Sequence, residues 1–464
     1  MEQSNGPHQL HNLPSSTKIE WENYIQKNYL HFDKRINMER TKVMEDVKDY
    51  IENPDNITSH AFFPFIHFDI VFKKYVTIKT VKPDGEVEKK KERKKKSRKI
   101  YYSAHKDSFI YKYYGDLLNI AYNNYAKQKG IDEVALAYRN NKTGKNNIDF
   151  SFEVFEFLFR QEEALVVSID FTSFFDNLSH NVLKQNIKTV LGTDKLPDAW
   201  YKVFKNLTQY SYINKTDIDA FLKRKHGVKK LKDIRLPKIM GSQDFRTFKR
   251  KHLKKNKETF GIPQGSGMSA VCSNVHLIHF DSEVLEWANQ HNAIYRRYCD
   301  DLILVIPTIG LSNASIESIK EELFTIFSEY EPQGMKIQAQ KTEVRIYRKK
   351  QILNESFEPS TLDYLGFVTD GQKMKLREKS LFNFYTRAYR KAKTSKRISY
   401  ATKLPGPKKE LYDLYTHLGY RYKGHGNFVS YALKAHEKMN TLRTQSLIRR
   451  QVKRHWEKIQ KRLH

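Results

Sequence analysis

Two apolar runs that meet aspartates constrain the fold of this chain more than any other feature. In ALVVSIDFTSFF an apolar run ends at Asp170, as expected of a buried strand whose carboxyl end carries a functional group. In YRRYCDDLILVIP, Asp300 and Asp301 separate two strand-like runs, which predicts a hairpin with the aspartates at its turn. Two adjacent carboxylates repel each other unless a cation compensates them, and a metal ion is the usual compensator. An ordinary solvated turn is the alternative for a bare Asp-Asp pair.

The charge of the chain points to a polyanionic partner. The 464 residues include 83 Lys and Arg against 53 Asp and Glu, a formal net charge of +30. Such a charge opposes compaction and exceeds what solubility needs, so nucleic acid is the leading explanation, with a basic surface that binds nothing as the alternative. A chain of this length can bury a large core divided among two or three subdomains.

Cysteine usage and hydropathy indicate a cytoplasmic protein. Cys272 and Cys299 are far apart in the sequence, which argues against a metal motif and fits a reducing compartment. The chain has no run of about eighteen apolar residues and no signal-peptide pattern near its start, so no membrane segment is expected.

The pattern along the first half of the chain mixes helical and extended segments. Residues 17–53 have apolar positions at roughly helical spacing, which predicts a helix there. Residues 60–81 are typical of a strand, and the lysine-rich residues 82–102, which include a Pro-Asp-Gly turn signal, are expected to form an exposed hairpin tip or loop. Residues 223–260 are basic and poor in acids, so we expect them to face solvent or phosphates.

The second half of the chain predicts an α+β unit followed by a helical one. Residues 315–330 have an amphipathic pattern after a Ser or Asn N-cap, and residues 335–347 alternate as in a strand. With the preceding hairpin these segments predict a βαβ-like arrangement. From about Lys373 to His464 the chain is very basic with a helical pattern, which indicates a separate module with a phosphate-facing side.

The aspartates of the two apolar runs predict a metal site. If the strands are neighbours in one sheet, Asp170, Asp300 and Asp301 converge on one edge and can bind two hard divalent cations through oxygen. Two such ions, roughly 3.5–4 Å apart, activate an attacking hydroxyl and stabilise the leaving oxygen in phosphoryl transfer.

The motifs around these aspartates resemble those of the reverse transcriptase superfamily, in the same order. SIDFTSFFDNLSH resembles the first palm motif, GIPQGSGMSAVCSN the Pro-Gln-Gly motif, and YCDD the Tyr-x-Asp-Asp box. GMKIQAQKTE resembles the Gly-x-Lys and Lys-Thr-Glu segment, and LDYLGF resembles the primer grip, so the likeness extends from Val166 to Phe367.

The resemblance implies an α+β, right-hand polymerase fold with fingers, a ferredoxin-like palm and an α-helical basic thumb. The expected parts are an N-terminal helical extension (1–60), fingers (61–165), a palm (166–372) with a basic fingers/palm insertion around 181–260, and a helical thumb (373–464).

The resemblance also implies roles for single residues. Asp170, Asp300 and Asp301 would be the catalytic metal ligands, with the Phe171 backbone assisting. Phe175 would be the steric gate that excludes a 2′-hydroxyl, although a core aromatic is the alternative. The other residues expected at the nucleotide are Phe171, Gln264, Gly265, Arg98 and Lys341.

The expected primer grip is the short segment Tyr364, Leu365 and Gly366, which would hold the primer end. Core packing is the alternative for Leu365, and a strand-surface lysine is the alternative for Lys341.

The activity implied is that of an RNA-directed DNA polymerase, a nucleotidyltransferase that adds deoxynucleotides to a primer end. Two Mg²⁺ ions would be its cofactors, with Mn²⁺ as a substitute. Its partners would be an RNA template, the DNA product and deoxynucleoside triphosphates, and it could form a homo-oligomer. The basic thumb would grip the nucleic-acid backbone without reading bases, which predicts strongly salt-dependent binding.

The extended N-terminal region is most similar to bacterial defence-associated reverse transcriptases of the abortive-infection or unknown groups. This implies an associated noncoding RNA as template and a role in antiphage defence. A retron-type enzyme is one alternative, although its Asn-Ala-x-x-His segment is missing. An RNA-dependent RNA polymerase is another, disfavoured by Phe175 and by Pro263, Gln264 and Gly265. A non-catalytic RNA-binding protein is disfavoured by the three aspartates.

Overall fold

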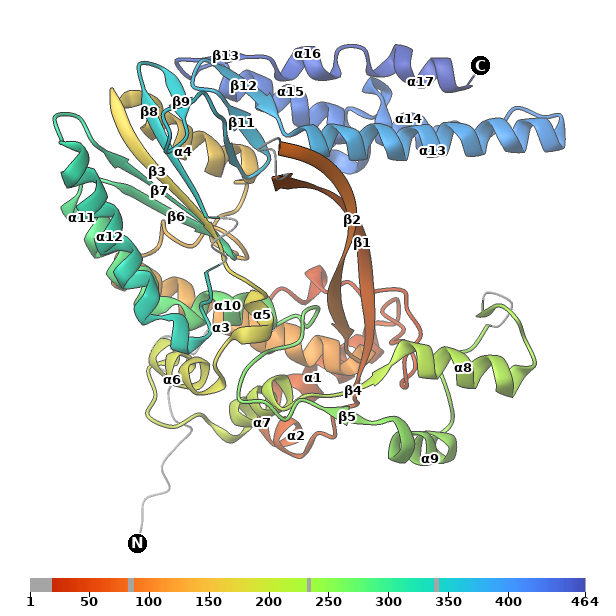
Figure 1. The fold of residues 1–464 in the computed structure, drawn as a ribbon. Coiled ribbons are helices and arrows are strands. Elements are labelled where there is room, and N and C mark those ends of the chain that lie inside the picture. The colour runs from red at the N-terminus through yellow and green to blue at the C-terminus, as the bar shows by residue number, and fades with distance from the viewer. Residues whose placement is uncertain (1–18, 82–86, 232–234, 338–341, 464) are drawn as a thin grey trace, which may run out of the picture.

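The computed structural model describes residues 19–81, 87–231, 235–337 and 342–463 (Figure 1). A five-stranded antiparallel sheet, in the order β6-β7-β3-β8-β9, is the centre of the fold. Its strands are β3 (Glu163–Asp170), β6 (Ile294–Tyr298), β7 (Asp301–Pro307), β8 (Glu343–Arg348) and β9 (Gln351–Leu353). The predicted hairpin is confirmed as β6 and β7, and the predicted buried strand is β3.

Helix α12 (Asn313–Glu329) connects β7 to β8 and is capped by the Ser312 side chain, as the sequence predicts. Because β7 and β8 are both antiparallel to β3, they run parallel to each other with β3 between them. This is the expected βαβ-like arrangement. The mixed α+β fold class is therefore confirmed.

Strict alternation along the central strands divides the interior into two cores. On β3, Leu165 and Val167 point into a core shared with α11 (Ile278–Gln290) and α12, whereas Ala164 and Val166 point into a second core. Helix α4 (Asn147–Arg160) covers that second face. A central strand buried on both faces explains the continuous apolar run in the sequence.

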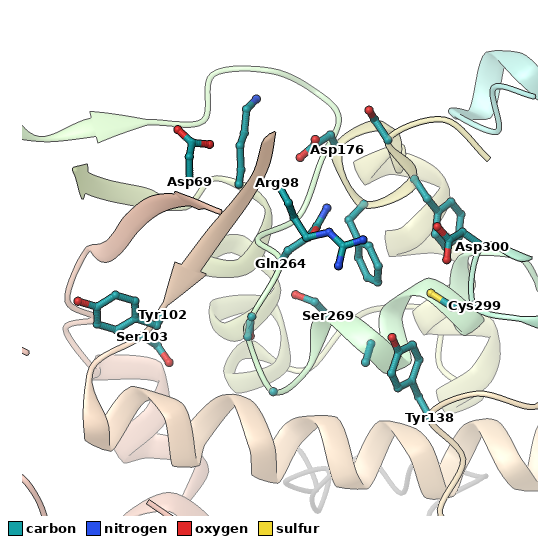
Figure 2. Close-up of a pocket in the computed structure, with 18 of the residues that line it drawn as sticks. Asp69, Arg98, Tyr102, Ser103, Tyr138, Asp176, Gln264, Ser269, Cys299 and Asp300 are labelled. Atoms are coloured by element: carbon teal, nitrogen blue, oxygen red, sulfur yellow. The ribbon is translucent and has the colours of Figure 1, made fainter. Parts of the chain in front are cut away.

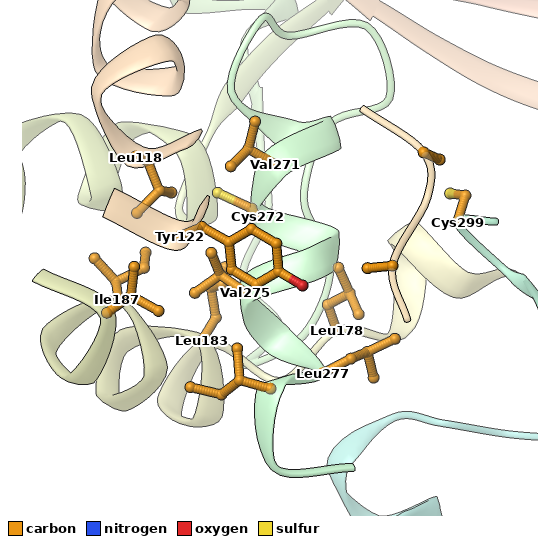
Figure 3. Close-up of a cluster of buried hydrophobic side chains, with 14 of the residues drawn as sticks. Leu118, Tyr122, Leu178, Leu183, Ile187, Val271, Cys272, Val275, Leu277 and Cys299 are labelled. Carbon is orange, nitrogen blue, oxygen red and sulfur yellow. The ribbon is translucent and has the colours of Figure 1, made fainter. Parts of the chain in front are cut away.

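A layer of helices supports the end of the sheet at which β3 terminates. Tyr122 lies among apolar side chains from α3, α6 and α10 in its centre, and it is fully buried (Figure 3). The helices of this layer are α1 (Thr41–Glu52), α2 (Pro54–Ser59), α3 (His105–Gln128), α5 (Phe174–Asn177), α6 (His180–Leu191), α7 (Asp198–Thr208) and α10 (Ser269–His276).

A long hairpin extends from this helical layer toward α13 (Figure 1). Strands β1 (Phe65–Val81) and β2 (Val87–Tyr102) pair in continuous antiparallel register. The lysine run predicted to be a tip or loop is instead part of β2, because pairing with β1 requires only backbone hydrogen bonds. The predicted Pro-Asp-Gly turn lies outside the described residues.

The basic segment predicted to face solvent has a small core of its own. Ile239, Met240 and Phe248 are buried there together with Phe32, so the prediction that this segment contributes no core is wrong. The elements around this small core are β4 (Ser211–Asn214), α8 (Lys215–His226), α9 (Ser242–His252) and β5 (Lys254–Lys255), of which β4 and β5 continue the sheet from the base of β1.

The helix predicted over residues 17–53 is much shorter than expected. Only α1 and the 3-10 turn η1 (Trp21–Asn23) are helical within the described part of this segment. Tyr24 is buried in the large core, where its hydroxyl donates to Asp116 at 2.9 Å, whereas Phe32 is buried in the small core. The chain between them has to span two cores, and this tertiary demand overrides the helical pattern.

The C-terminal region is helical as predicted, but it also contributes strands. β12 (Lys373–Leu376) pairs with β11 (Phe367–Thr369) and β13 (Gln445–Ser446), and β11 pairs with β10 (Leu362–Tyr364). The helices are α13 (Glu378–Thr402), α14 (Lys409–Tyr415), α15 (Phe428–Met439), α16 (Ile448–Val452) and α17 (His455–Leu463), and the remaining 3-10 turns are η3 (Glu331–Gln333), η5 (His417–Gly419) and η6 (Tyr422–Gly424).

The predicted domain boundaries stay predictions. Within the described residues, no helix combines the length and the apolar character needed to cross a membrane.

Candidate active site

The register of the central sheet brings the predicted aspartates together. Asp170, the last residue of β3, lies directly opposite Asp301, the first residue of β7. Asp300 is in the β6–β7 turn, and its carbonyl oxygen accepts a hydrogen bond from the Phe171 backbone at 3.3 Å. Side chains opposite each other on antiparallel strands have β-carbons about 4.5–5.5 Å apart. The end of β3 is thus held against the start of β7 and against the β6–β7 turn by backbone contacts.

These aspartates line a cavity of about 1220 Å³. In Figure 2, Asp69 and Tyr102 lie at one end of it, Asp300 and Cys299 lie at the other, and Arg98 and Gln264 lie between them. The predicted site residues that the cavity brings together are Arg98, Asp170, Phe171, Phe175, Gln264, Gly265, Asp300 and Asp301.

The two phenylalanines predicted at the nucleotide play different structural parts. The Phe171 ring is buried and stacks on Phe174 at a centroid distance of 5.6 Å, so mainly its backbone faces the aspartates. Phe175 is only partly buried and lines the cavity. Its carbonyl accepts from the Ile262 amide at 2.9 Å, which fixes α5 against the segment before Gln264.

Gly265 allows the Pro-Gln-Gly loop to approach the base of the long hairpin. Its φ is +119°, and a β-carbon there would lie 2.3 Å from the Tyr101 carbonyl oxygen. The Tyr101 amide donates to the Gln264 carbonyl at 2.8 Å. The glycine is therefore required by contact with β2, and the hydrogen bond from Tyr101 holds the loop against the strand that carries Arg98.

The cavity mixes basic and acidic side chains. Arg98, Lys96 and Lys99 line it from β2. Burial raises the pKa of Asp176, and the charges of Lys99 and His67 only partly oppose this. Such a surface can bind an anionic ligand together with metal cations, because its basic side chains attract the anion and its carboxylates attract the cations.

The donor atoms at the strand ends suit a hard cation. The cross-strand pair Asp170 and Asp301, with Asp300 beside it, offers only carboxylate and backbone oxygens, the ligands preferred by Mg²⁺ and Mn²⁺. In the described part of the chain, however, no three His, Cys, Asp or Glu side chains are arranged so that they could hold a metal ion. The three residues share one cavity wall at one edge of the sheet, and their role as metal ligands stays a prediction.

The predicted primer grip is a tight hairpin beside the cavity. Leu365 and Gly366, both with positive φ, form the turn between β10 and β11. None of Tyr364, Leu365 and Gly366 lines the cavity, but the Gly366 carbonyl accepts from the Arg377 amide at 2.9 Å, and Arg377 does line it. Burial and the nearby Asp301 raise the pKa of Tyr364. Lys341 lies outside the described residues.

Sequence reasoning missed a buried ion pair beneath the aspartate turn. Arg297, on β6, and Asp281, on α11, are both fully buried, with nitrogen–oxygen distances of 2.6 and 2.8 Å. Arg297 also donates to the Cys299 carbonyl at 3.0 Å, and Tyr295 donates to Asp281 at 2.8 Å. The two arginines in the middle of the IYRRY strand run were the available signal, because an arginine that is buried in a strand needs a partner.

Tyr138 lines the cavity and was also not predicted from the sequence. Its φ of 60° is in the left-handed region, and its carbonyl accepts from Asn119 at 2.6 Å. The ring lies beside Cys299 at the edge of the cavity (Figure 2). Burial and then Asp300 raise the pKa of the Cys299 thiol to about 12.

Comparison with known proteins gives one family and several distant structures. The family described as "Reverse transcriptase (RNA-dependent DNA polymerase)" matches residues 121–369, which is more than half of the chain. No curated protein matches.

Among solved structures, apo telomerase from Candida tropicalis truncated from its C-terminal domain matches with a TM-score of 0.37 and 12% identity, over 73% of this chain and 61% of that one. Telomerase from Candida albicans in complex with a TWJ fragment of telomeric RNA matches with a TM-score of 0.39 and 12% identity, over 94% of this chain and 71% of that one. The chain thus spans less than two thirds of the Candida tropicalis protein.

Proposed function

Because the chain belongs to the reverse transcriptase (RNA-dependent DNA polymerase) family of nucleotidyltransferases, we propose that it extends a primer with deoxynucleotides along an RNA template. The observation that carries this proposal is the cross-strand pair Asp170 and Asp301 at the wall of a cavity lined by Arg98 and Gln264. A carboxylate pair opposite basic side chains is what transfer of a nucleotide needs.

We propose the roles of the side chains from the family resemblance, and their places in the cavity support these roles. Arg98 and its neighbours on β2 hold the triphosphate, and Phe175 contacts the sugar and leaves no room for a 2′-hydroxyl. The primer hydroxyl attacks the α-phosphate, a new phosphodiester forms and pyrophosphate leaves. Two Mg²⁺ ions held by Asp170, Asp300 and Asp301 would neutralise the charge that develops on the phosphate oxygens.

We further propose that the primer grip and the C-terminal module hold the primer end. The hairpin at Tyr364, Leu365 and Gly366 is joined to the cavity through Arg377, which also pairs with Asp363. The basic α13 would contact the phosphate backbone, which would make binding depend steeply on salt. The predicted parts, namely extension, fingers, palm and thumb, keep their predicted boundaries in this proposal.

The biological setting rests on the resemblance of the N-terminal region, and the charge of +30 supports only a nucleic-acid partner. We propose a bacterial, cytoplasmic enzyme of antiphage defence that copies an associated noncoding RNA. Lys341 keeps its proposed place near the nucleotide phosphates. Recovery of one small RNA with the protein, and of DNA complementary to it, would support this setting.

Asparagine substitution of the aspartates tests the activity. Asp170→Asn and Asp301→Asn should each abolish primer extension while unfolding and RNA affinity stay close to wild type, because shape is preserved and charge is lost. Glu163→Gln is the matched control, because it lies at the other end of β3 in an exposed ion pair with Arg348 that is worth roughly 0–1 kcal/mol. Wild-type extension by either asparagine variant would refute the assignment. A preference for ribonucleotides would favour an RNA-dependent RNA polymerase.

A further inference from the structure

A second cavity, of about 920 Å³, lies where the N-terminal segment meets the basic insertion. Residues 28–35 form one side, Tyr102 at the end of β2 forms another, and α8 with Leu231 and residues 235–239 closes the third. No predicted site residue lines it. The cavity therefore has a chemistry separate from that of the aspartate site.

The floor of this cavity is apolar. Ile218, Leu222 and Ile239 are buried at its base and belong to the small core that also contains Phe32. Leu30 and Leu236 are partly buried at its sides. A ligand that fits must present an apolar face to this floor.

An aromatic wall joins the second cavity to the first. Tyr29 and Tyr102 line both cavities, and their ring centroids are 4.7 Å apart. Tyr29 is also stacked on His105 at 4.9 Å, and its hydroxyl donates to the Ser103 carbonyl at 2.8 Å. These contacts hold the rings in place. Because the two cavities adjoin at this wall, a nucleic-acid strand that leaves the catalytic cavity past the two rings reaches the second cavity directly.

The rim of the second cavity is basic. Lys34, Arg35, Lys215 and Arg235 line it, whereas Asp219 is the one carboxylate among its described lining residues and is paired with Lys215 at 2.6 Å. Within the described part of the chain, neither Lys34 nor Arg235 forms a hydrogen bond or an ion pair, and both are exposed. The rim thus offers two uncommitted cations beside an apolar floor.

We propose that this cavity holds an unpaired base of the single-stranded RNA template, just outside the catalytic cavity. A nucleotide unit combines what the cavity combines, because its base has a flat apolar face and its phosphate is an anion. The base lies on the floor against Tyr29 and Tyr102, and the flanking phosphates lie at Lys34 and Arg235. The identity of the strand as template rests on the proposed function.

The test compares overhangs on the same duplex, with full-length protein. Primer-template RNA carrying one or ten unpaired template nucleotides is titrated against wild type and the double variant K34E/R235E. K223E/R224E is the control, because it makes the same change of charge on exposed residues that do not line the cavity. For a single strand, each phosphate contact contributes about 0.7 to the slope of log K against log salt concentration. Loss of two contacts in K34E/R235E should therefore lower the magnitude of that slope by about 1.4 for the long overhang and leave it unchanged for the short one.

A photocrosslink locates the base. Template RNA with 4-thiouridine in the unpaired segment should crosslink to Tyr29 or Tyr102 in wild type and in K223E/R224E. Equal weakening by both double variants, or crosslinks only outside the cavity, would overturn the proposal. So would a change of oligomeric state in K34E/R235E without a change in RNA binding, because a second copy of the chain would then be the occupant.

Failure of the proposed function gives a different result. If wild type extends no primer but the overhang effect and the crosslink persist, the cavity proposal stands for RNA binding and the polymerase proposal falls. If extension on the short overhang is normal and the overhang effect is absent, only the cavity proposal is overturned.

Discussion

Removal of the Asp281 carboxylate should destabilise the protein more than a typical core substitution. Asp281 and Arg297 are both fully buried and share two hydrogen bonds, of 2.6 and 2.8 Å. Although burial disfavours the charge, Asp281 raises the pKa of Arg297 above its ordinary value. Because a guanidinium is not deprotonated in proteins, Arg297 of an Asp281→Ala variant would stay charged in the closed core, without its counterion.

The size of the loss follows from the buried groups that Asp281→Ala leaves without a partner. Breaking a buried ion pair by removing one partner costs about 3–5 kcal/mol. The Tyr295 hydroxyl loses its acceptor as well, and a buried unsatisfied donor costs about 1–3 kcal/mol. The two effects share one site and are not fully additive, so we expect a loss of about 4 kcal/mol or more in the free energy of unfolding. That is a large part of the roughly 5–15 kcal/mol typical of a domain.

Urea unfolding measures the loss of stability. The reactivity of Cys299 shows whether the structure loosens at the aspartate turn. Arg297 holds the Cys299 carbonyl at 3.0 Å, and the buried thiol has a pKa raised to about 12, so wild type should resist alkylation at neutral pH. In Asp281→Ala the turn loosens, and Cys299 should react much faster than the buried Cys272.

The double variant Asp281→Leu with Arg297→Met separates stability from positioning. It removes both charges together, which is often neutral or stabilising, so its stability should lie far closer to wild type than that of Asp281→Ala. It still lacks the donor to the Cys299 carbonyl and should therefore extend primers more slowly. A loss below about 1 kcal/mol in Asp281→Ala, against the expected loss of about 4 kcal/mol or more, would refute the argument.

Two further predictions concern selectivity and pH. Phe175→Ala should raise incorporation of ribonucleotides relative to deoxynucleotides, because the ring lines the cavity; unchanged selectivity in competition assays would place the gate elsewhere. The pKa of Asp132 is lowered from 3.8 to about 2, because its pairs with Lys142 and Arg139 outweigh the opposing effect of burial. The stability it contributes is present above pH 3.8 and is lost as pH falls through about 2, so Asp132→Asn should show a smaller fall in unfolding midpoint over that interval, and parallel curves would contradict this.

The sequence alone predicted the elements whose signals are local. Strand β3, the hairpin that carries Asp300 and Asp301, and α12 with its Ser312 cap each follow from patterns within about twenty residues. The family, too, was identified from motifs that are short and ordered along the chain.

Only the tertiary structure decided what depends on contacts between distant segments. Between residues 19 and 40 the helical pattern formed only the short 3-10 turn η1, because Tyr24 and Phe32 are buried in different cores. The lysine run became a strand because β1 pairs with it along its whole length.

The sites divide in the same way. The aspartates could be named from the sequence, but the placement of Asp170 directly opposite Asp301 is a matter of strand register. The partner of Arg297 on α11 and the second cavity, whose walls come from three separate segments, have no local pattern at all. Local patterns report which face of an element is apolar, whereas the long-range packing of those faces determines which side chains finally meet.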